Sequence, residues 1–209
     1  MGLGIAVALG LFVVCGSASA GTLADFADTY ISALNPVVNF GSSTDILVGP
    51  GAEALVQCNL SSLGVSSVSS ASLLLWVDGI ATSGGVDISM VTSPWSASSV
   101  TFNTQPTIAA PFLANAVVTV SGQYVSFDVT SAVNVWLASP ITDFGFAINP
   151  AVAAPSTAFT FASQRNSINH PPELSAPAFG AVPEPASWLL TGAGLAFALL
   201  LRTKKLGRR

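Results

Sequence analysis

The residue types that could do chemistry in this sequence are aromatic rings and carboxylates. In the stretch 71–77 apolar residues recur at every second position, among them Leu73 and Leu75, as in a strand with one buried face. Trp76 falls on the opposite face. Sugar rings pack their C–H surfaces against exposed aromatic rings. Trp76 is therefore the candidate carbohydrate contact, and burial of its ring by a sheet edge or a covering loop is the alternative.

Three carboxylates lie near the first predicted strand, at Asp25, Asp28 and Asp45. Hard cations such as Ca²⁺ prefer clustered oxygen ligands, so these residues are the candidate metal ligands. The sequence has no D-x-D-x-D-G loop, which makes scattered, solvated acids the favoured alternative. No other cofactor is expected.

Catalytic chemistry has little support in the sequence. His170 is the only histidine and precedes two prolines, which is typical of a loop with a solvated side chain. One histidine excludes a zinc site built from several histidines, and neither a G-x-S-x-G motif nor a phosphate loop is present. Cys58 shares an apolar face with Ala54, Val56 and Leu60 and is expected to be buried. We therefore expect that the protein is not an enzyme.

The chain carries few charges, and they are unevenly distributed. Only 8% of the 209 residues are charged, against about 25% in an ordinary soluble domain. Five of the six basic residues lie in 202–209, and Arg165 is the other. Residues 21–182 therefore hold one basic and nine acidic residues, a net charge of −8 with His neutral. Such a domain repels phosphate backbones, so nucleic acid is excluded as a partner, and an anionic polysaccharide would need bridging cations.

Residues 21–181 show the pattern of a β protein. Short runs with period-two alternation are separated by Gly-, Ser- and Pro-rich turns. This predicts a β-sandwich or jelly roll of about eight to ten strands. One short helix is expected over 131–138, with Thr130 as its N-cap and Pro140 as its stop. The aromatic residues expected inside are Phe127, Phe144, Phe146, Phe159 and Phe161.

Both ends of the chain are apolar. An uncharged run over 3–16 is followed by Ala18, Ser19 and Ala20, an A-x-A pattern that predicts a signal peptide over 1–20 cleaved before Gly21. The alternative is a buried N-terminal helix. At the other end, residues 185–201 are uncharged and precede the five cations. This predicts a short transmembrane helix whose basic end stays in the cytoplasm, so that residues 21–182 face outward.

Val182, Pro183, Glu184 and Pro185 stand directly before this apolar segment. The order of V-P-E-P, a short helix and a basic end over 182–209 resembles the PEP-CTERM sorting tail of Gram-negative bacteria. The resemblance implies exosortase as a partner and cleavage near the tripeptide. It also implies a transient stay in the inner membrane, then release to the cell surface or extracellular matrix, commonly in bacteria that make exopolysaccharide. A plain C-terminal anchor is the alternative.

A series of short segments over roughly 24–179 carries a second resemblance. These segments are Ala27–Ile31, Asn39–Ser43, Ser70–Val77, Pro94-Trp95, Ser99–Asn103 with Pro106, Phe127–Thr130 with Val133 and Trp136, Phe144–Phe146, Phe161–Ser163 and Pro172–Leu174. In this order they resemble the DNRLRE domain, a jelly-roll family related to carbohydrate-binding modules. The resemblance implies that Trp95 and Trp136 fill the core. The sequence departs from the family pattern at 57–60, at Ala97 and at 163–165, where usual charges are neutral or altered.

Three functions are compatible with these observations. The first is a non-catalytic exported surface or matrix protein that binds extracellular polysaccharide. The second is a structural coat or self-associating matrix protein with no specific glycan. A polysaccharide lyase or hydrolase ranks last, because no catalytic motif is present.

Overall fold

The computed structural model describes residues 21–167 and 170–176. They belong to a compact unit that spans Ser19–Phe179. The predicted signal peptide, residues 1–20, and the predicted sorting tail, residues 182–209, lie outside the described residues. No helix within the described part of the chain is long and apolar enough to cross a membrane.

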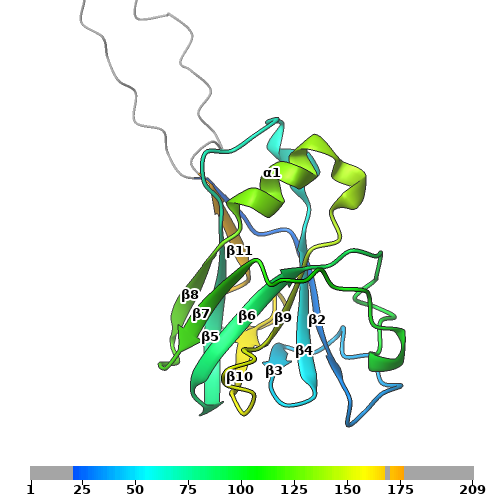
Figure 1. The fold of residues 1–209 in the computed structure, drawn as a ribbon, viewed down its shortest axis with the longest axis vertical. Helices are drawn as coiled ribbons and strands as arrows, with labels where there is room; N and C mark the ends of the chain where they lie inside the picture. Colours follow the sequence, from blue (N-terminus) through cyan, green and yellow to red (C-terminus); the bar gives the residue numbers. More distant parts are fainter. Residues whose placement is uncertain (1–20, 168–169, 177–209) are drawn as a thin grey trace, which may run out of the picture. The chain divides into compact units, whose positions relative to one another are not determined.

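Eleven antiparallel strands form two sheets in the described residues (Figure 1). Four helical segments connect them: α1 (Thr130–Ala138), η1 (Leu60–Leu63), η2 (Phe102–Thr104) and η3 (Pro140–Thr142). Sheet A contains β1 (Gly21–Leu23), β3 (Asp45–Val48), β5 (Ser72–Thr82), β8 (Gln123–Asp128), β10 (Ala158–Ala162) and β11 (Glu173–Ala176). Sheet B contains β2 (Phe26–Ser32), β4 (Ala52–Cys58), β6 (Gly84–Met90), β7 (Ala114–Val118) and β9 (Phe146–Pro150).

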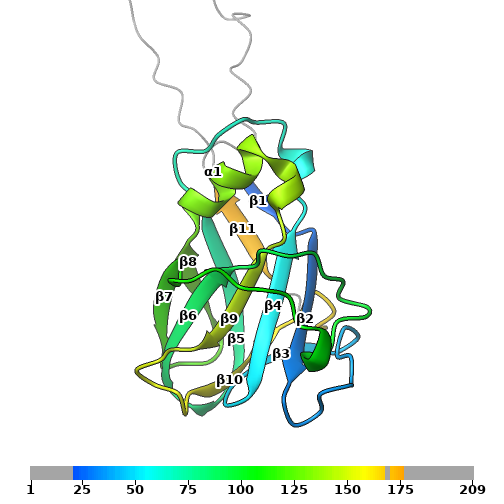
Figure 2. The same ribbon diagram turned by 45° about the vertical axis from the view of Figure 1, so that its right-hand side comes forward.

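The two sheets face each other as a β-sandwich, and α1 covers one end (Figures 1 and 2). Sheet B runs in the order β2-β4-β9-β6-β7. Sheet A runs β1-β11-β5-β10-β3, with β8 also paired to β5. Most neighbours are distant in sequence, so the chain crosses between the sheets repeatedly. The predicted sandwich is confirmed. The described residues form eleven strands where about eight to ten were predicted, because segments such as β1 are too short to show a periodic pattern.

Strand β5 is the centre of sheet A. One edge pairs with β8 over residues 72–77, while the other pairs with β11 over 72–74 and with β10 over 77–82. Leu73, Leu75 and Val77 are buried in the core, and Trp76 lies on the outward face, half-buried. The alternation predicted for this stretch is therefore confirmed.

The core between the sheets is rich in aromatic and branched side chains. Phe127, Phe146, Phe159 and Phe161 are buried there as predicted, and so is Trp136. Cys58 is buried beside Ala54, Val56 and Leu60, also as predicted. Because residues of both sheets contribute, burial of apolar surface is the main force that holds the sandwich together.

The prediction for Phe144 is wrong. Gly145 has a φ of +77°, and a Cβ at this position would overlap the backbone of Val56. This conformation interrupts the period-two alternation just before β9. Phe144 is therefore half-buried and packs with Trp95 against a second cluster that is separate from the main core. The buried members of that cluster are Ile31, Leu55, Val91, Val100 and Ala147.

The predicted helix is present as α1, but its N-terminus differs from the prediction. Thr130 is the first helical residue, and Val129 occupies the cap position. The Asp128 Oδ1 atom accepts hydrogen bonds from the Thr130 backbone N–H (3.0 Å) and hydroxyl (2.6 Å). The side chain of Asp128, and not that of Thr130, therefore accepts the hydrogen bond from the first N–H of α1. The Thr130 hydroxyl instead accepts a hydrogen bond from the N–H of Ala71 (2.9 Å), which ties α1 to the residue just before β5.

Candidate functional site

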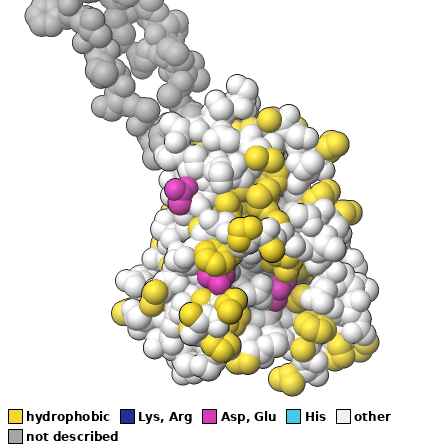
Figure 3. Space-filling model, viewed as in Figure 1, with side chains coloured by type: hydrophobic (Ala, Val, Ile, Leu, Met, Phe, Trp, Pro, Cys, Tyr) yellow, Lys and Arg dark blue, Asp and Glu magenta, His cyan; other side chains and the backbone are white. Residues whose placement is uncertain are grey.

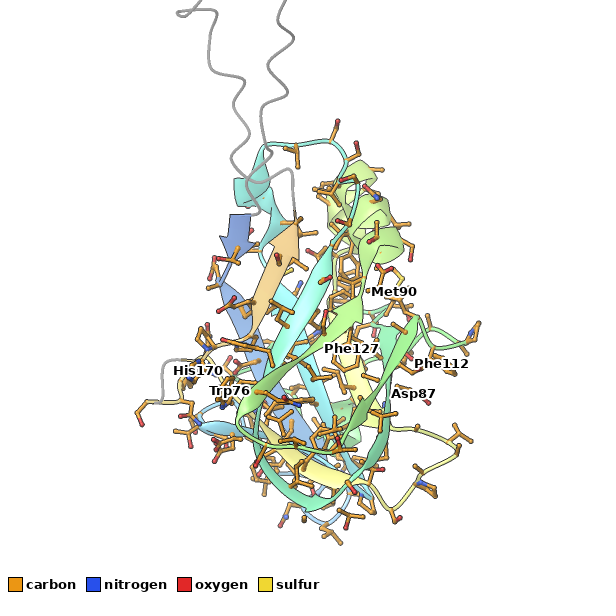
Figure 4. The ribbon with its side chains drawn as sticks, turned by 90° about the vertical axis from the view of Figure 1, so that its left-hand side faces the viewer. Trp76, Asp87, Met90, Phe112, Phe127 and His170 are labelled. Carbon is orange, nitrogen blue, oxygen red and sulfur yellow. The ribbon has the colours of Figure 1, made fainter. Side chains whose placement is uncertain are left out.

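Three rings meet on the outward face of sheet A, and we call Trp76, Tyr124 and His170 the aromatic cluster. The His170 ring stacks on Trp76 with centroids 3.8 Å apart and planes 14° apart. The Tyr124 ring meets Trp76 edge-on, with centroids 5.2 Å apart. All three side chains are half-buried. Figure 4 shows Trp76 and His170 side by side at one edge of the molecule.

Strand register brings these rings together. Trp76 of β5 pairs directly with Tyr124 of β8, so the two side chains are neighbours on the same face. His170 lies three positions before β11, whose Glu173 pairs with Leu74 of β5. The side chains of Tyr124 and Glu173 thus approach each other over β5.

A carboxylate fixes the tyrosine of the aromatic cluster. Tyr124 Oη donates a hydrogen bond to Glu173 Oε1 at 3.0 Å, and the Pro171 carbonyl lies 3.3 Å away. Burial, together with this bond to the Glu173 carboxylate and its charge, raises the pKa of Tyr124 to about 12. The phenol therefore stays protonated at physiological pH. The result is an aromatic surface with a fixed hydroxyl and a carboxylate at its rim.

The position of His170 differs from the prediction. A solvated loop histidine was expected, whereas the ring is half-buried and covers one face of Trp76. Tyr124 and Glu173 were missed. The alternation of Val125 and Phe127 could have identified Tyr124 as an outward residue of β8, but nothing local indicates that Glu173 lies beside it.

Asp28, a candidate metal ligand, is engaged in a buried ion pair. It is 1% exposed, and its Oδ1 lies 2.7 Å from Arg165 Nη1. Its carboxylate also accepts hydrogen bonds from the Ser163 hydroxyl (2.7 Å) and the Gln164 N–H (2.6 Å). The altered motif at 163–165 therefore joins the end of β10 to β2. A buried carboxylate with this many donors needs no metal to compensate its charge.

The other two candidate ligands lie apart from Asp28. Asp25 Oδ2 accepts a hydrogen bond from Asn59 (3.3 Å), and Asp45 Oδ1 accepts one from Asn166 (2.9 Å). Within the described residues no group of three His, Cys, Asp or Glu side chains is placed to hold a metal ion. The three candidate calcium ligands are thus not brought together in the described part of the chain.

A pocket of about 710 Å³, which we call the end pocket, opens at the α1 end of the sandwich. Its polar lining comes from Asp25, Gln57, Asn59, Ser61 and Asp143. Burial raises the pKa of Asp143 to about 6, partly offset by the hydrogen bond from the Gly145 N–H. The stretch 57–60, where the sequence departs from the pattern it resembles, lines this pocket. The apolar lining residues are Phe26, Ala27, Cys58, Leu60, Trp136, Leu137 and Pro140.

Comparison with known families finds a match that covers the described residues. A model of carbohydrate-binding module family 96 matches residues 19–176, well over half of the chain. The chain belongs to carbohydrate-binding module family 96. No curated protein matches it closely enough to count as a relative.

The described part of this family 96 module contains very few basic side chains. Arg165 is the only basic residue among those described, and its guanidinium is tied to Asp28. Figure 3 shows acidic and hydrophobic side chains on one face, with no lysine or arginine among them. A ligand that depends on cationic side chains therefore has little to bind.

A second cavity of the module, about 420 Å³, holds a buried carboxyl group. Glu53 lies in its wall beside Asn149 and Phe102. Burial raises the pKa of Glu53 to about 7, although a hydrogen bond with Asn149 lowers it. The folded protein thus keeps a proton that the unfolded chain releases near pH 4.5. The contribution of Glu53 to the free energy of unfolding is therefore greatest below pH 4.5 and is lost as the pH rises through about 7.

We predict that E53Q removes most of this pH dependence. In the wild type the free energy of unfolding should fall by on the order of 3 kcal/mol, at about 1.4 kcal/mol for each pH unit between the two pKa values of Glu53. Glutamine has the same shape and never ionises, so the variant should be more stable than wild type at pH 8. Urea unfolding at pH 5 and pH 8 measures this, with D78N at an exposed carboxylate as the matched control. Equal losses in wild type and E53Q would contradict the burial argument.

Proposed function

We propose that the protein is a non-catalytic, exported glycan-binding protein whose jelly-roll module, of the DNRLRE type, binds polysaccharide through the aromatic cluster. The observation that carries this proposal is the arrangement of Trp76, Tyr124 and His170 on one sheet face, within a family 96 module. A second function, a structural coat that associates with itself, becomes the better account if no glycan binds.

The chemistry of the aromatic cluster suits a sugar chain. Half-buried rings offer C–H-compatible apolar surface, and stacking on His170 holds Trp76 in place before a ligand arrives. The Tyr124 hydroxyl and the Glu173 carboxylate supply a hydrogen-bonding rim for sugar hydroxyls. Apolar contact for one side of a sugar ring, with fixed polar groups at its border, is what a polyhydroxylated ligand requires.

The contacts of two titratable side chains support a non-catalytic role. His170 is stacked on Trp76, and Asp28 is neutralised by Arg165. Both groups have structural partners, so neither is poised as a base beside a nucleophile. Carbohydrate-binding modules as a class hold glycans without cleaving them.

Export and sorting form the cellular part of the proposal. Cleavage after Ala20 would leave Gly21, the first residue of β1, at the new N-terminus. The tail from Val182 to Pro185 follows β11 in the sequence, so exosortase would cut beyond the last strand of the described residues. The protein would pass through the inner membrane and reach the cell surface or extracellular matrix of a Gram-negative bacterium.

We predict that W76A weakens glycan binding by about tenfold or more, which corresponds to at least about 1.4 kcal/mol. The measurement is a glycan array with the full chain in a detergent that carries no sugar headgroup, with calcium and with chelator. F112A is the matched control, because Phe112 is an exposed aromatic residue (47%) that lies away from Trp76 (Figure 4). Thermal unfolding of both variants separates lost binding from lost folding.

Two results of this array would contradict the proposal. Equal binding by W76A and F112A would place the glycan elsewhere on the module. Binding to no glycan, with or without calcium, would favour the structural coat.

The sorting proposal predicts the mass of the extracellular protein. It should begin at Gly21 and end close to Pro185, without the five cations of 202–209. Intact-mass analysis of secreted material measures both ends. Retention of Met1 would contradict the signal peptide, and retention of 202–209 in cells with functional exosortase would leave only a plain anchor.

A further inference from the structure

Strand β7 forms one edge of sheet B, and its outer side has no partner strand. Among the described strands only β6 pairs with β7, over five successive pairs from Ala114 to Val118 without a register shift. The other side of β7 therefore presents backbone N–H and C=O groups that no described strand takes up. Strands β7 and β8 lie on the same side of the sandwich, and Figure 4 looks onto that side.

The β7 edge lacks the features that usually protect an edge strand from pairing. Those features are charged side chains, proline and β-bulges, and Ala114–Val118 contains none of them. The longer stretch 88–127 contains no Asp, Glu, Lys, Arg or His. Val117 is 70% exposed and Val120 is 55% exposed, which adds apolar surface beside this edge. The edge is thus suited to pair with another uncharged strand.

The other terminal strands of the two sheets are protected or short. Arg165 Nη1 donates a hydrogen bond to the backbone carbonyl of Asp28 in β2 (3.3 Å), so Arg165 covers part of the opposite edge of sheet B. In sheet A, β3 begins with Asp45 and β8 ends with Asp128. Strand β1 has only three residues. Among the described edge strands, β7 is therefore the one best able to pair with another chain.

We propose that β7 pairs antiparallel with β7 of a second copy of this chain, so that sheet B continues across a two-fold dimer. In such a dimer the same edge supplies donors and acceptors to both copies, because every contact occurs twice. This inference goes beyond glycan binding and does not depend on it. Strand β7 belongs to sheet B, whereas the aromatic cluster lies on the outward face of sheet A.

Charge favours this edge as the contact between identical copies. Residues 21–182 have a net charge of −8 with His neutral, so two copies repel each other over most of their surface. The carboxylate on the neighbouring strand is that of Asp87 in β6, which pairs with Asn115. Paired β7 strands would keep the two Asp87 positions at least three strand spacings apart, about 14 Å. This exceeds the screening length of about 8 Å at physiological ionic strength, so repulsion across the edge is weak.

The test measures self-association of the full chain in detergent, without any glycan, by sedimentation equilibrium up to about 100 μM protein. A five-residue edge gives a small interface, typical of weak association, and we expect a reversible dimer with a Kd below about 100 μM. V117K should weaken dimerisation by about tenfold or more, because it puts a charge into the edge. V135K, the same change at an exposed valine of α1 (52%), should leave dimerisation unchanged. Both variants keep the apolar ends of the chain, so their difference reports on β7.

Crosslinking gives a second measurement that does not depend on V117K folding correctly. Treatment of V117C with a short bis-maleimide should produce a covalent dimer on a denaturing gel. V135C should give only the background that wild type shows through its native Cys15 and Cys58. Thermal unfolding of each variant checks that the module is folded.

Three results would overturn this inference. One is the absence of a dimer at about 100 μM, and another is equal association of V117K and V135K, which would place the contact elsewhere in the chain. The third is crosslinking of V117C no stronger than that of V135C. None of these results bears on the aromatic cluster, which W76A tests separately.

Discussion

The pairing of β5 with three other strands is the constraint on which the rest of the module depends. Its eleven residues hold β8 at one edge and β11 and β10 at the other. Because strand side chains alternate, the same backbone sends Leu73 and Leu75 into the core and Trp76 outward. A slip of one residue would exchange these faces and lose both the core and the aromatic cluster.

Local patterns predict much of this fold, and their failures have physical causes. Period-two alternation correctly placed Phe127 and Phe161 in the core and Trp76 outside. Phe144 was misplaced because the left-handed backbone at Gly145 interrupts the alternation. Stacking of His170 on Trp76 depends on the pairing of β11 with β5, a contact between segments about a hundred residues apart. No local pattern encodes such a contact.

Electrostatics connects the stability of the module with its choice of ligand. The one described cation, Arg165, is used to neutralise buried Asp28 between β2 and the end of β10. Removing Arg165 would leave the buried carboxylate of Asp28 without its counter-charge, which destabilises the fold. The remaining surface is acidic, and the aromatic cluster contains no lysine or arginine. An anionic glycan would therefore need bridging cations at this face.

The central claim is that the outward face of β5 binds sugar. A crystal structure of the protein with a bound uncharged oligosaccharide tests it most directly. The account predicts sugar rings packed against Trp76, Tyr124 or His170, with hydroxyls within hydrogen-bond distance of Glu173. A saturating oligosaccharide that left all three rings uncontacted and lay over the outer face of sheet B would contradict it.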